Sequence, residues 1–263
     1  VRDIIKIRSV KSKVIDDKIG YVKLLQFQEK TDEELENALK GLEKDNINAL
    51  ILDLRNNPGG LLSVSIDVAS TFLPPQKLVV SVKGRDEVKD KAEYFTSNNK
   101  HRLEYPMIVL VNEGSASASE IVAGALQDWE RAVVLGTTTF GKGSVQVVIP
   151  LSDGSGLKLT TSRYYTPKGR SIQVTGIVPD IVVELKTKDK MAANHTIVRE
   201  KDLKRHLENE KDKETADVEK KKEEEKSVEE VLVEISDEDD IQLQRAVDLL
   251  KSLRVFKQLP KAG

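Results

Sequence analysis

Residues 1–185 carry a repeating pattern in which a short apolar run is followed by apolar residues at helical spacing. Runs such as Met107–Val111 are typical of buried strands, whereas Leu62, Ile66 and Ala69 recur on one face of a helix. The expected strands are 19–27, 48–54, 78–82, 107–111, 132–136, 145–149 and 157–164, and the expected helices are 31–44, 62–73 and 117–128. Residues 83–99 are expected to form a charged excursion anchored only by two aromatic residues. Alternating strands and helices predict an α/β fold.

The pattern changes after Leu185. From residue 186 to about residue 240 lysine and glutamate dominate, which predicts a charged linker or solvated helices because such a run buries too little apolar area to offset ordering. Residues 241–263 regain an amphipathic pattern and are expected to form a C-terminal helix. This helix is expected to pack on the core or, as the alternative, on a second copy in a homo-oligomer. The predicted organisation is therefore a core (1–185), a charged segment (186–240) and an amphipathic helix (241–263).

Composition excludes several classes of function. The net charge is −2 and no basic patch is interleaved with aromatic residues, so nucleic acid is not an expected partner. Cysteine is absent and the three histidines are scattered, so we expect no disulfide framework, no metal site and no cofactor. No apolar run reaches the length of a membrane span. The chain starts at Val1 without methionine or a signal peptide, and we expect a processed product or a fragment.

The segment Asn112–Glu120 lies between a predicted buried strand and a predicted helix. A small-residue turn at such a place can present a serine hydroxyl beside the free N–H groups of a helix start, and we interpret Ser117 as a nucleophile. A serine hydroxyl needs a neighbouring base to take its proton. None of the histidines (His101, His195 and His206) has a sequence context typical of a catalytic residue, so a lysine is the expected base.

Lys142 lies in a second small-residue segment, Gly141–Gln146, and we interpret it as this base. A lysine acts as a base only when neutral, so its pKa must fall from about 10.4 to roughly 7–8, which requires about 3–5 kcal/mol of desolvation. The flanking glycines allow close backbone approach, and Phe140 and Val145 supply apolar cover. Gln146 could hold the amine without adding a charge.

Other interpretations remain open. The serines of 115–119 could form an N-cap cluster, and Asn56–Gly60 could be an ordinary strand-to-helix turn that uses glycine at positive φ. Gly136–Lys142 is one residue short of a phosphate-binding loop, which would indicate an NTPase. Gly143 occupies the position of the magnesium-binding Ser or Thr, however, and the residues after it favour a strand where a helix is needed. A non-catalytic scaffold is the remaining rival.

Five blocks occur in order along the chain. They are Asp-Leu-Arg-Asn-Asn-Pro-Gly-Gly (53–60), Ser-Ala-Ser-Ala-Ser-Glu (115–120), Phe-Gly-Lys-Gly-Ser-Val-Gln (140–146), Tyr-Tyr-Thr-Pro-Lys-Gly-Arg-Ser-Ile-Gln (164–173) and Gly-Ile-Val-Pro-Asp (176–180). Over about residues 1–185 the chain thereby resembles the carboxyl-terminal processing proteases, also called tail-specific proteases. The resemblance implies a serine endopeptidase that cleaves protein substrates near apolar C-termini. It also implies Ser117 as nucleophile, Lys142 as general base and Gln146 as the residue that orients the lysine.

The same resemblance implies a ClpP/crotonase-like ββα spiral core, followed here by a charged, largely helical C-terminal tail. It places the oxyanion-hole amides at Ala118 and at Gly59 or Gly60, and the loop Thr166–Arg170 close to the active site. A bacterial envelope location, periplasmic or extracytoplasmic, is also implied. These proteases usually carry a PDZ domain before the catalytic core, and residues 1–18 are expected to be the link from such a domain.

Overall fold

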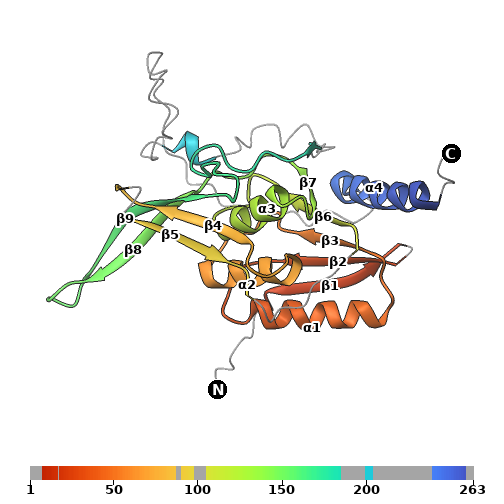
Figure 1. Cartoon of the computed structure of the whole chain (residues 1–263), viewed down its shortest axis with the longest axis horizontal. Coiled ribbons are helices and arrows are strands. Elements are labelled where there is room, and N and C mark those ends of the chain that lie inside the picture. Colours follow the sequence, from red (N-terminus) through yellow and green to blue (C-terminus); the bar gives the residue numbers. More distant parts are fainter. Residues whose placement is uncertain are drawn as a thin grey trace, which may run out of the picture.

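The computed structural model describes residues 8–16, 18–86, 90–97, 105–184, 199–203 and 239–258. A six-stranded sheet in the order β1-β2-β3-β6-β7-β10 forms its centre (Figure 1). These strands are Val10–Ile15 (β1), Ile19–Leu24 (β2), Ala49–Asp53 (β3), Met107–Val111 (β6), Val133–Gly136 (β7) and Ile181–Val182 (β10). β1 pairs with β2 antiparallel, and the other neighbours are parallel. Parallel sheets are covered on both faces, which explains why every residue of β3 and β6 is buried.

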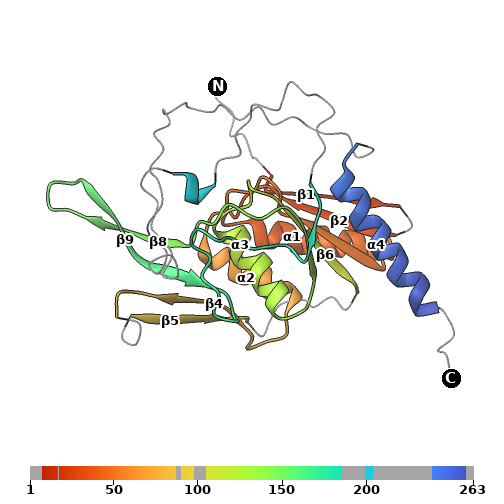
Figure 2. The ribbon, with the colours of Figure 1, turned by 90° about the horizontal axis from the view of Figure 1, so that it is seen from above.

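Helices cover the two faces of this sheet, as Figures 1 and 2 show from two directions. They are α1 (Thr31–Lys44), α2 (Leu62–Phe72), α3 (Ala118–Asp128) and α4 (Ile241–Gln258). α1, α2 and α3 share one buried apolar cluster with side chains from one face of the sheet. Leu243, Ala246 and Leu250 of α4 form a second cluster with side chains from the opposite face, among them Ile51 and Leu110. The amphipathic C-terminal segment therefore packs on the core of its own chain, as expected.

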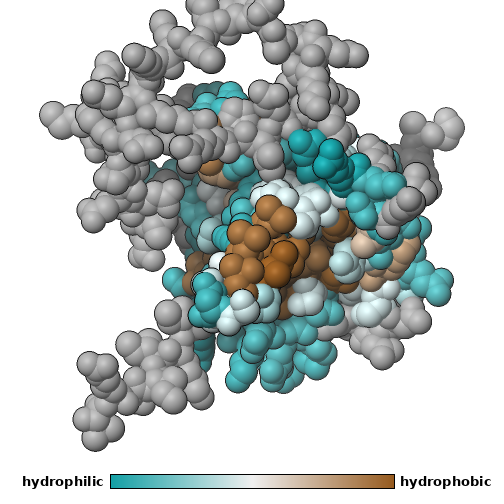
Figure 3. Space-filling model, turned by 90° about the vertical axis from the view of Figure 1, so that its left-hand side faces the viewer, coloured by the Kyte–Doolittle hydropathy of each residue, from teal (hydrophilic) through white to brown (hydrophobic). Residues whose placement is uncertain are grey.

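A second, four-stranded sheet in the order β5-β4-β9-β8 lies beside the core. Its strands are Leu78–Lys83 (β4), Lys91–Phe95 (β5), Ser144–Pro150 (β8) and Gly156–Tyr165 (β9). β8 and β9 form a hairpin that projects to the left in Figure 1. Cross-strand pairing places Val147 opposite Leu159 and Ile149 opposite Leu157, so four aliphatic side chains share one face of the hairpin. They are between 41% and 47% exposed, and Figure 3, which faces this end of the molecule, shows an apolar patch.

The α/β class is confirmed, and each predicted strand and helix of the core is present with bounds shifted by a few residues at most. Three strands were not predicted. β1 lies within residues 1–18, which were expected to be a link, and it pairs antiparallel with β2. β5 lies within the charged excursion and all of its residues are exposed, so its strand conformation depends on pairing with β4. β10 spans two residues and pairs with β7. Residues 1–7, and residues 186–238 apart from 199–203, lie outside the described part of the chain, as do the expectations that concern them.

Candidate active site

Three segments that follow neighbouring parallel strands meet at the carboxyl edge of the central sheet. Residues 56–60 follow β3, residues 112–117 follow β6, and residues 137–143 follow β7. The Ala116 N–H donates to the Asn57 carbonyl at 3.0 Å, and the Phe140 N–H donates to the Ser115 carbonyl at 3.0 Å. Because ligands of open α/β sheets bind outside this edge, we identify it as the candidate active site.

Ser117 occupies the N-cap position of α3 and is partly buried. Its backbone has φ 55° and ψ −111°, a conformation that non-glycine residues rarely adopt. Such strain persists only where the surroundings enforce it, and it occurs preferentially at functional sites. The N-cap interpretation of this serine cluster is thus correct for the position of Ser117, and it does not exclude a chemical role for the hydroxyl.

The glycine turn lies directly against Ser117. Gly59 has φ 99°, and a Cβ placed on it would lie 2.9 Å from the Ser117 Cβ and 2.9 Å from the Ala118 nitrogen. Only glycine fits this approach. The Gly59 N–H donates to the Asn57 side-chain oxygen at 2.9 Å. Among the residues that the structure describes, the N–H groups of Gly60 and Ala118 have no hydrogen-bond acceptor, so these two amides are available to a bound anion.

Lys142 is partly buried between two glycines that pack tightly on the segment 172–174. A Cβ on Gly141 would lie 2.7 Å from the Val174 carbonyl oxygen, and one on Gly143 would lie 2.3 Å from the Gln173 nitrogen. The Gly143 N–H donates to the Gln173 side-chain oxygen at 3.0 Å, and the Val174 N–H donates to the Gly141 carbonyl at 2.8 Å. The expected close backbone approach at both glycines is therefore confirmed.

Glu120 joins the serine segment to the lysine segment, a role that our sequence analysis missed. Its fully buried carboxylate accepts the Ser117 N–H at 2.8 Å and the Lys142 N–H at 2.9 Å on the same oxygen, Oε2. Its other oxygen accepts the Gly141 N–H at 2.7 Å and the Thr139 hydroxyl at 2.6 Å. Burial raises the pKa of Glu120 to about 7, although these four hydrogen bonds oppose the rise. The Ser-x-x-Glu spacing of a capping box was the available signal.

The structure thus brings Ser117, Ala118, Gly59, Gly60 and Lys142 to one edge of the sheet. Within the described ranges no hydrogen bond joins the side chains of Ser117 and Lys142.

Gln146 lies farther along β8 and is exposed. The register between β8 and β9 shifts between Val145 and Gln146, an irregularity of the kind that is common near active sites. In the part of the chain that the structure describes, the Gln146 amide has no hydrogen bond to Lys142. Its orienting role stays a prediction.

Two further expectations can be compared with the structure. Residues 144–150 form a strand, so the helix that a phosphate-binding loop needs after Lys142 is absent there and the NTPase interpretation is contradicted. The loop Thr166–Arg170 lies at the C-terminal end of α3, where Arg170 pairs with Asp128, and not at the Ser117 end. It is the residues after this loop, Gln173 and Val174, that contact the lysine segment, because the chain folds back along the end of β9, where the Ile172 N–H donates to the Tyr164 carbonyl at 3.2 Å. The three histidines lie outside the described residues.

This edge of the sheet combines three kinds of group. They are the Ser117 hydroxyl at the N-terminus of α3, the backbone N–H groups of Gly60 and Ala118, and the Lys142 side chain on the loop after β7. Amides fixed in this way can stabilise a developing oxyanion without reorganisation. No group of three or more His, Asp or Glu side chains in the described residues could hold a metal ion. Together, these groups are those required for acyl transfer through a serine.

Comparison with known proteins identifies the family. The model of peptidase family S41 matches residues 18–183, which include all three segments of the candidate site. This chain belongs to peptidase family S41. The match ends before α4, so the residues of the C-terminal helix lie outside the family region.

Curated S41 relatives include two bacterial proteins. The carboxy-terminal-processing protease of Bartonella bacilliformis is 48% identical over 211 residues, which are 79% of this chain and 48% of that protein. The carboxyl-terminal-processing protease of Synechocystis sp. is 43% identical over 187 residues, 70% of this chain and 43% of that protein. This chain therefore spans about half, or less, of the length of these relatives.

Solved structures of similar proteins align with the fold of this chain. A photosystem II D1 C-terminal processing protease aligns with a TM-score of 0.62 and 34% identity, over 70% of this chain and 50% of that chain. A putative S41 protease from Bacteroides fragilis aligns with a TM-score of 0.65 over 96% of this chain and 60% of that chain, at 16% identity, which supports the fold alone. No helix within the described residues has the length and apolar character needed to cross a membrane.

Proposed function

We propose that this protein is a serine endopeptidase that cleaves protein substrates near their C-termini. The observation that carries the proposal is the single Glu120 oxygen that accepts the backbone N–H groups of both Ser117 and Lys142. It fixes the two segments at a short separation, beside the amides of Ala118 and Gly60. The names of the S41 relatives support the same reaction, because each describes carboxyl-terminal processing.

In the proposed mechanism the Ser117 hydroxyl attacks the substrate carbonyl and passes its proton to the neutral amine of Lys142. The N–H groups of Ala118 and Gly60 hold the oxyanion, and Gly60 is preferred over Gly59 because the Gly59 N–H already donates to Asn57. The charged lysine then protonates the leaving amine. Water hydrolyses the acyl-enzyme by the same route. Gln146 is proposed to orient the lysine amine, and no metal or organic cofactor is required.

The proposed substrate is an unfolded or extended polypeptide with an apolar C-terminal segment. Its support is the aliphatic face of the β8–β9 hairpin, because β8 begins two residues after Lys142 and leads directly to this face. A bacterial envelope location is proposed from the family resemblance. Homo-oligomers through the C-terminal segment are also proposed, since Leu253, Val255 and Phe256 at the end of α4 are exposed.

The test is cleavage of an unfolded reporter protein with an apolar tail, with the cleavage sites mapped by mass spectrometry. Ser117→Ala and Lys142→Ala should each lower the rate by at least a thousandfold while the thermal unfolding transition stays cooperative, because nucleophile and base act as a unit. Ser63→Ala and Lys40→Ala make the same substitutions at exposed helix positions and should keep full activity. Activity of Ser117→Ala within tenfold of the wild type would refute the nucleophile, and an inactive wild type would favour a non-catalytic scaffold.

A further inference from the structure

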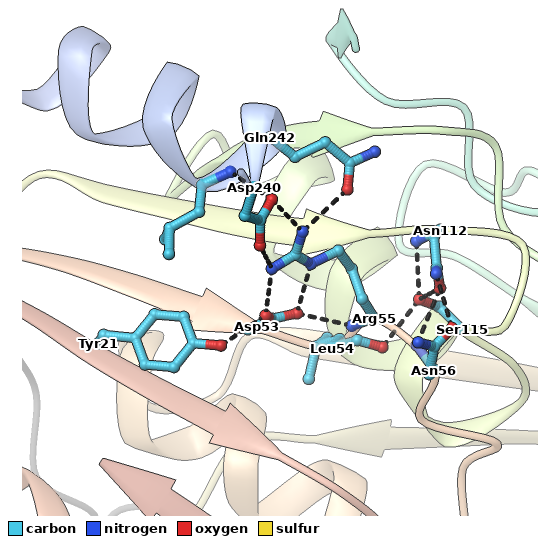
Figure 4. Close-up of polar contacts among 10 residues, drawn as sticks. Tyr21, Asp53, Leu54, Arg55, Asn56, Asn112, Ser115, Asp240 and Gln242 are labelled. Carbon is cyan, nitrogen blue, oxygen red and sulfur yellow. Dashed lines mark hydrogen bonds and ion pairs between the residues drawn. The ribbon is translucent and has the colours of Figure 1, made fainter. Parts of the chain in front are cut away.

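Arg55 is a buried guanidinium whose five N–H groups all have acceptors (Figure 4). Its Nε and one Nη2 hydrogen donate to the two oxygens of Asp53, at 3.0 and 2.7 Å. Its other Nη2 hydrogen and one Nη1 hydrogen donate to the two oxygens of Asp240, at 2.7 and 2.8 Å. The last Nη1 hydrogen donates to the Gln242 side-chain oxygen at 3.0 Å. Asp240 and Gln242 belong to the start of α4, so the C-terminal helix completes the coordination of this arginine.

The arginine lies directly before the glycine turn of the candidate active site. The Asn56 N–H donates to the Asn112 side-chain oxygen at 2.8 Å, and the Asn112 amide donates back to the Asn56 side-chain oxygen at 2.7 Å. The Ser115 hydroxyl donates to the Leu54 carbonyl at 2.8 Å. Figure 4 shows these bonds beside the Arg55 cluster. The Arg55 side chain is therefore bound to α4. Its neighbours in the chain, Leu54 and Asn56, hold the loop that leads to Ser117.

Electrostatics make this anchor strong at neutral pH. A buried guanidinium must keep its ionic partners, because an unpaired charge in the interior is strongly unfavourable. Burial alone would raise the pKa of Asp240, but the hydrogen bonds and charge of Arg55 lower it below its ordinary value. Asp53 is held in turn by the Tyr21 hydroxyl, which donates to it at 2.7 Å. Without Asp240, Arg55 would lose half of its carboxylate contacts and would have to move toward water.

We propose that Asp240 is a positioning residue for the reaction: by binding Arg55, it fixes the Asn56–Gly60 turn and thereby aims the Gly60 N–H at the oxyanion. The inference rests on the proposed function. It assigns a role in the active site to a residue outside the region that matches the S41 family model. The C-terminal helix is then part of the catalytic scaffold as well as a cover for the sheet.

The experiment compares Asp240→Asn with Asp248→Asn in the full chain, with kcat and KM measured on the unfolded reporter. Both variants remove one negative charge from the same segment, but Asp248 is exposed and has no contact with Arg55. Asp240→Asn should lower kcat about tenfold with KM within twofold of the wild type, because a displaced oxyanion donor loses part of the hundredfold or more that a deleted one costs. Asp248→Asn should leave both constants unchanged.

Gln242→Met is a milder variant that can be measured if Asp240→Asn does not fold. Gln242→Met leaves both ion pairs intact and removes one acceptor from Arg55, and it should lower kcat several-fold. Binding of a peptide aldehyde, which needs the oxyanion amides, should weaken in parallel, whereas binding of the cleaved peptide product should not. A kcat within twofold of the wild type in Gln242→Met and in any folded Asp240→Asn overturns this inference alone. Absence of cleavage by the wild type contradicts the proposed function instead.

Discussion

Among the residues that the structure describes, the buried carboxylate of Glu120 has no positively charged partner, yet it accepts four hydrogen bonds from the serine and lysine segments. An ionised carboxylate can accept all four, whereas a protonated one must use one oxygen as a donor. Because burial raises the pKa of Glu120 to about 7, the geometry that holds Ser117 near Lys142 depends on a group that titrates close to neutral pH.

Stability should therefore depend on pH through Glu120. Burial raises the pKa of Glu120 to about 7 in the folded protein, against 4.5 for an unperturbed glutamate. The folded state therefore binds more protons between these pH values, and the free energy of unfolding falls as pH rises through that window. The contribution is on the order of 3 kcal/mol. Glu120→Gln, measured by urea unfolding in a Ser117→Ala background, should lose this slope. The exposed Glu130→Gln should keep it, and equal slopes in the two variants would show that Glu120 does not titrate here.

Gly143 tests the close packing of the lysine segment. A Cβ at this position would meet the Gln173 backbone nitrogen at 2.3 Å, and backbone cannot move aside as a flexible side chain can. Gly143→Ala should therefore displace Lys142 and lower kcat at least tenfold, since misplacement of a catalytic group by about 1 Å can cost a hundredfold. Gly41→Ala in α1, where nothing lies within 4 Å of the new methyl group, should keep activity and unfold at a slightly higher temperature. Unchanged kcat in Gly143→Ala would mean that the loop tolerates the shift.

At the scale of elements, the β8–β9 hairpin connects the lysine segment to an exposed apolar surface. β8 is an edge strand of its sheet, and its aliphatic face is built from pairs that lie directly opposite each other. Exposed apolar clusters of this kind are typical of binding surfaces. The hairpin is therefore the element that we expect to contribute most to substrate affinity.

Charge on this face should weaken substrate binding without affecting the chemistry. Leu157→Lys and Leu159→Lys should each raise KM for a reporter with an apolar tail about tenfold at unchanged kcat, because burying one leucine contributes about 1.5–3 kcal/mol. Val148→Lys adds the same charge to the opposite face of the hairpin and is the matched control. The assay is steady-state cleavage of two reporters that differ only in whether the tail is apolar or polar. An equal effect of all three variants on both reporters would contradict the prediction that this face binds apolar tails.

At the scale of the whole molecule, the sheet is covered by α1, α2 and α3 on one face and by α4 on the other (Figure 2). The candidate site lies at the carboxyl edge of this sheet. Segments far apart in sequence meet there because β3, β6 and β7 are parallel neighbours. The Asp240–Arg55 contact extends this convergence across 185 positions. The layered architecture thus places the start of the C-terminal helix against Arg55, next to the turn of the candidate active site.

Part of this organisation could be predicted from local sequence. Continuous apolar runs predict β3 and β6 because both faces of a parallel strand are buried, and helical spacing predicts α2 and α3. The candidate residues Ser117, Lys142 and the glycine turn were found from short motifs. β5 was missed because it is short, lies within a charged stretch and is exposed along its whole length, so that only its pairing with β4 makes it a strand. Motifs and periodicity describe the residues of a segment, but they do not predict which other segments it will contact in the fold.

The sequence by itself determined the type of each core element, the covalent setting of the serine and lysine and, through its motifs, the peptidase family. Only the tertiary structure decided which segments are neighbours. It revealed that Glu120 accepts hydrogen bonds from both the serine and the lysine segment, that the Gly59 N–H already donates to Asn57, and that Asp240 completes the contacts of Arg55. Strand order and the docking of a distant helix create these contacts. They depend on long-range packing, and no local pattern of hydrophobic and polar residues encodes which buried donor will meet which acceptor.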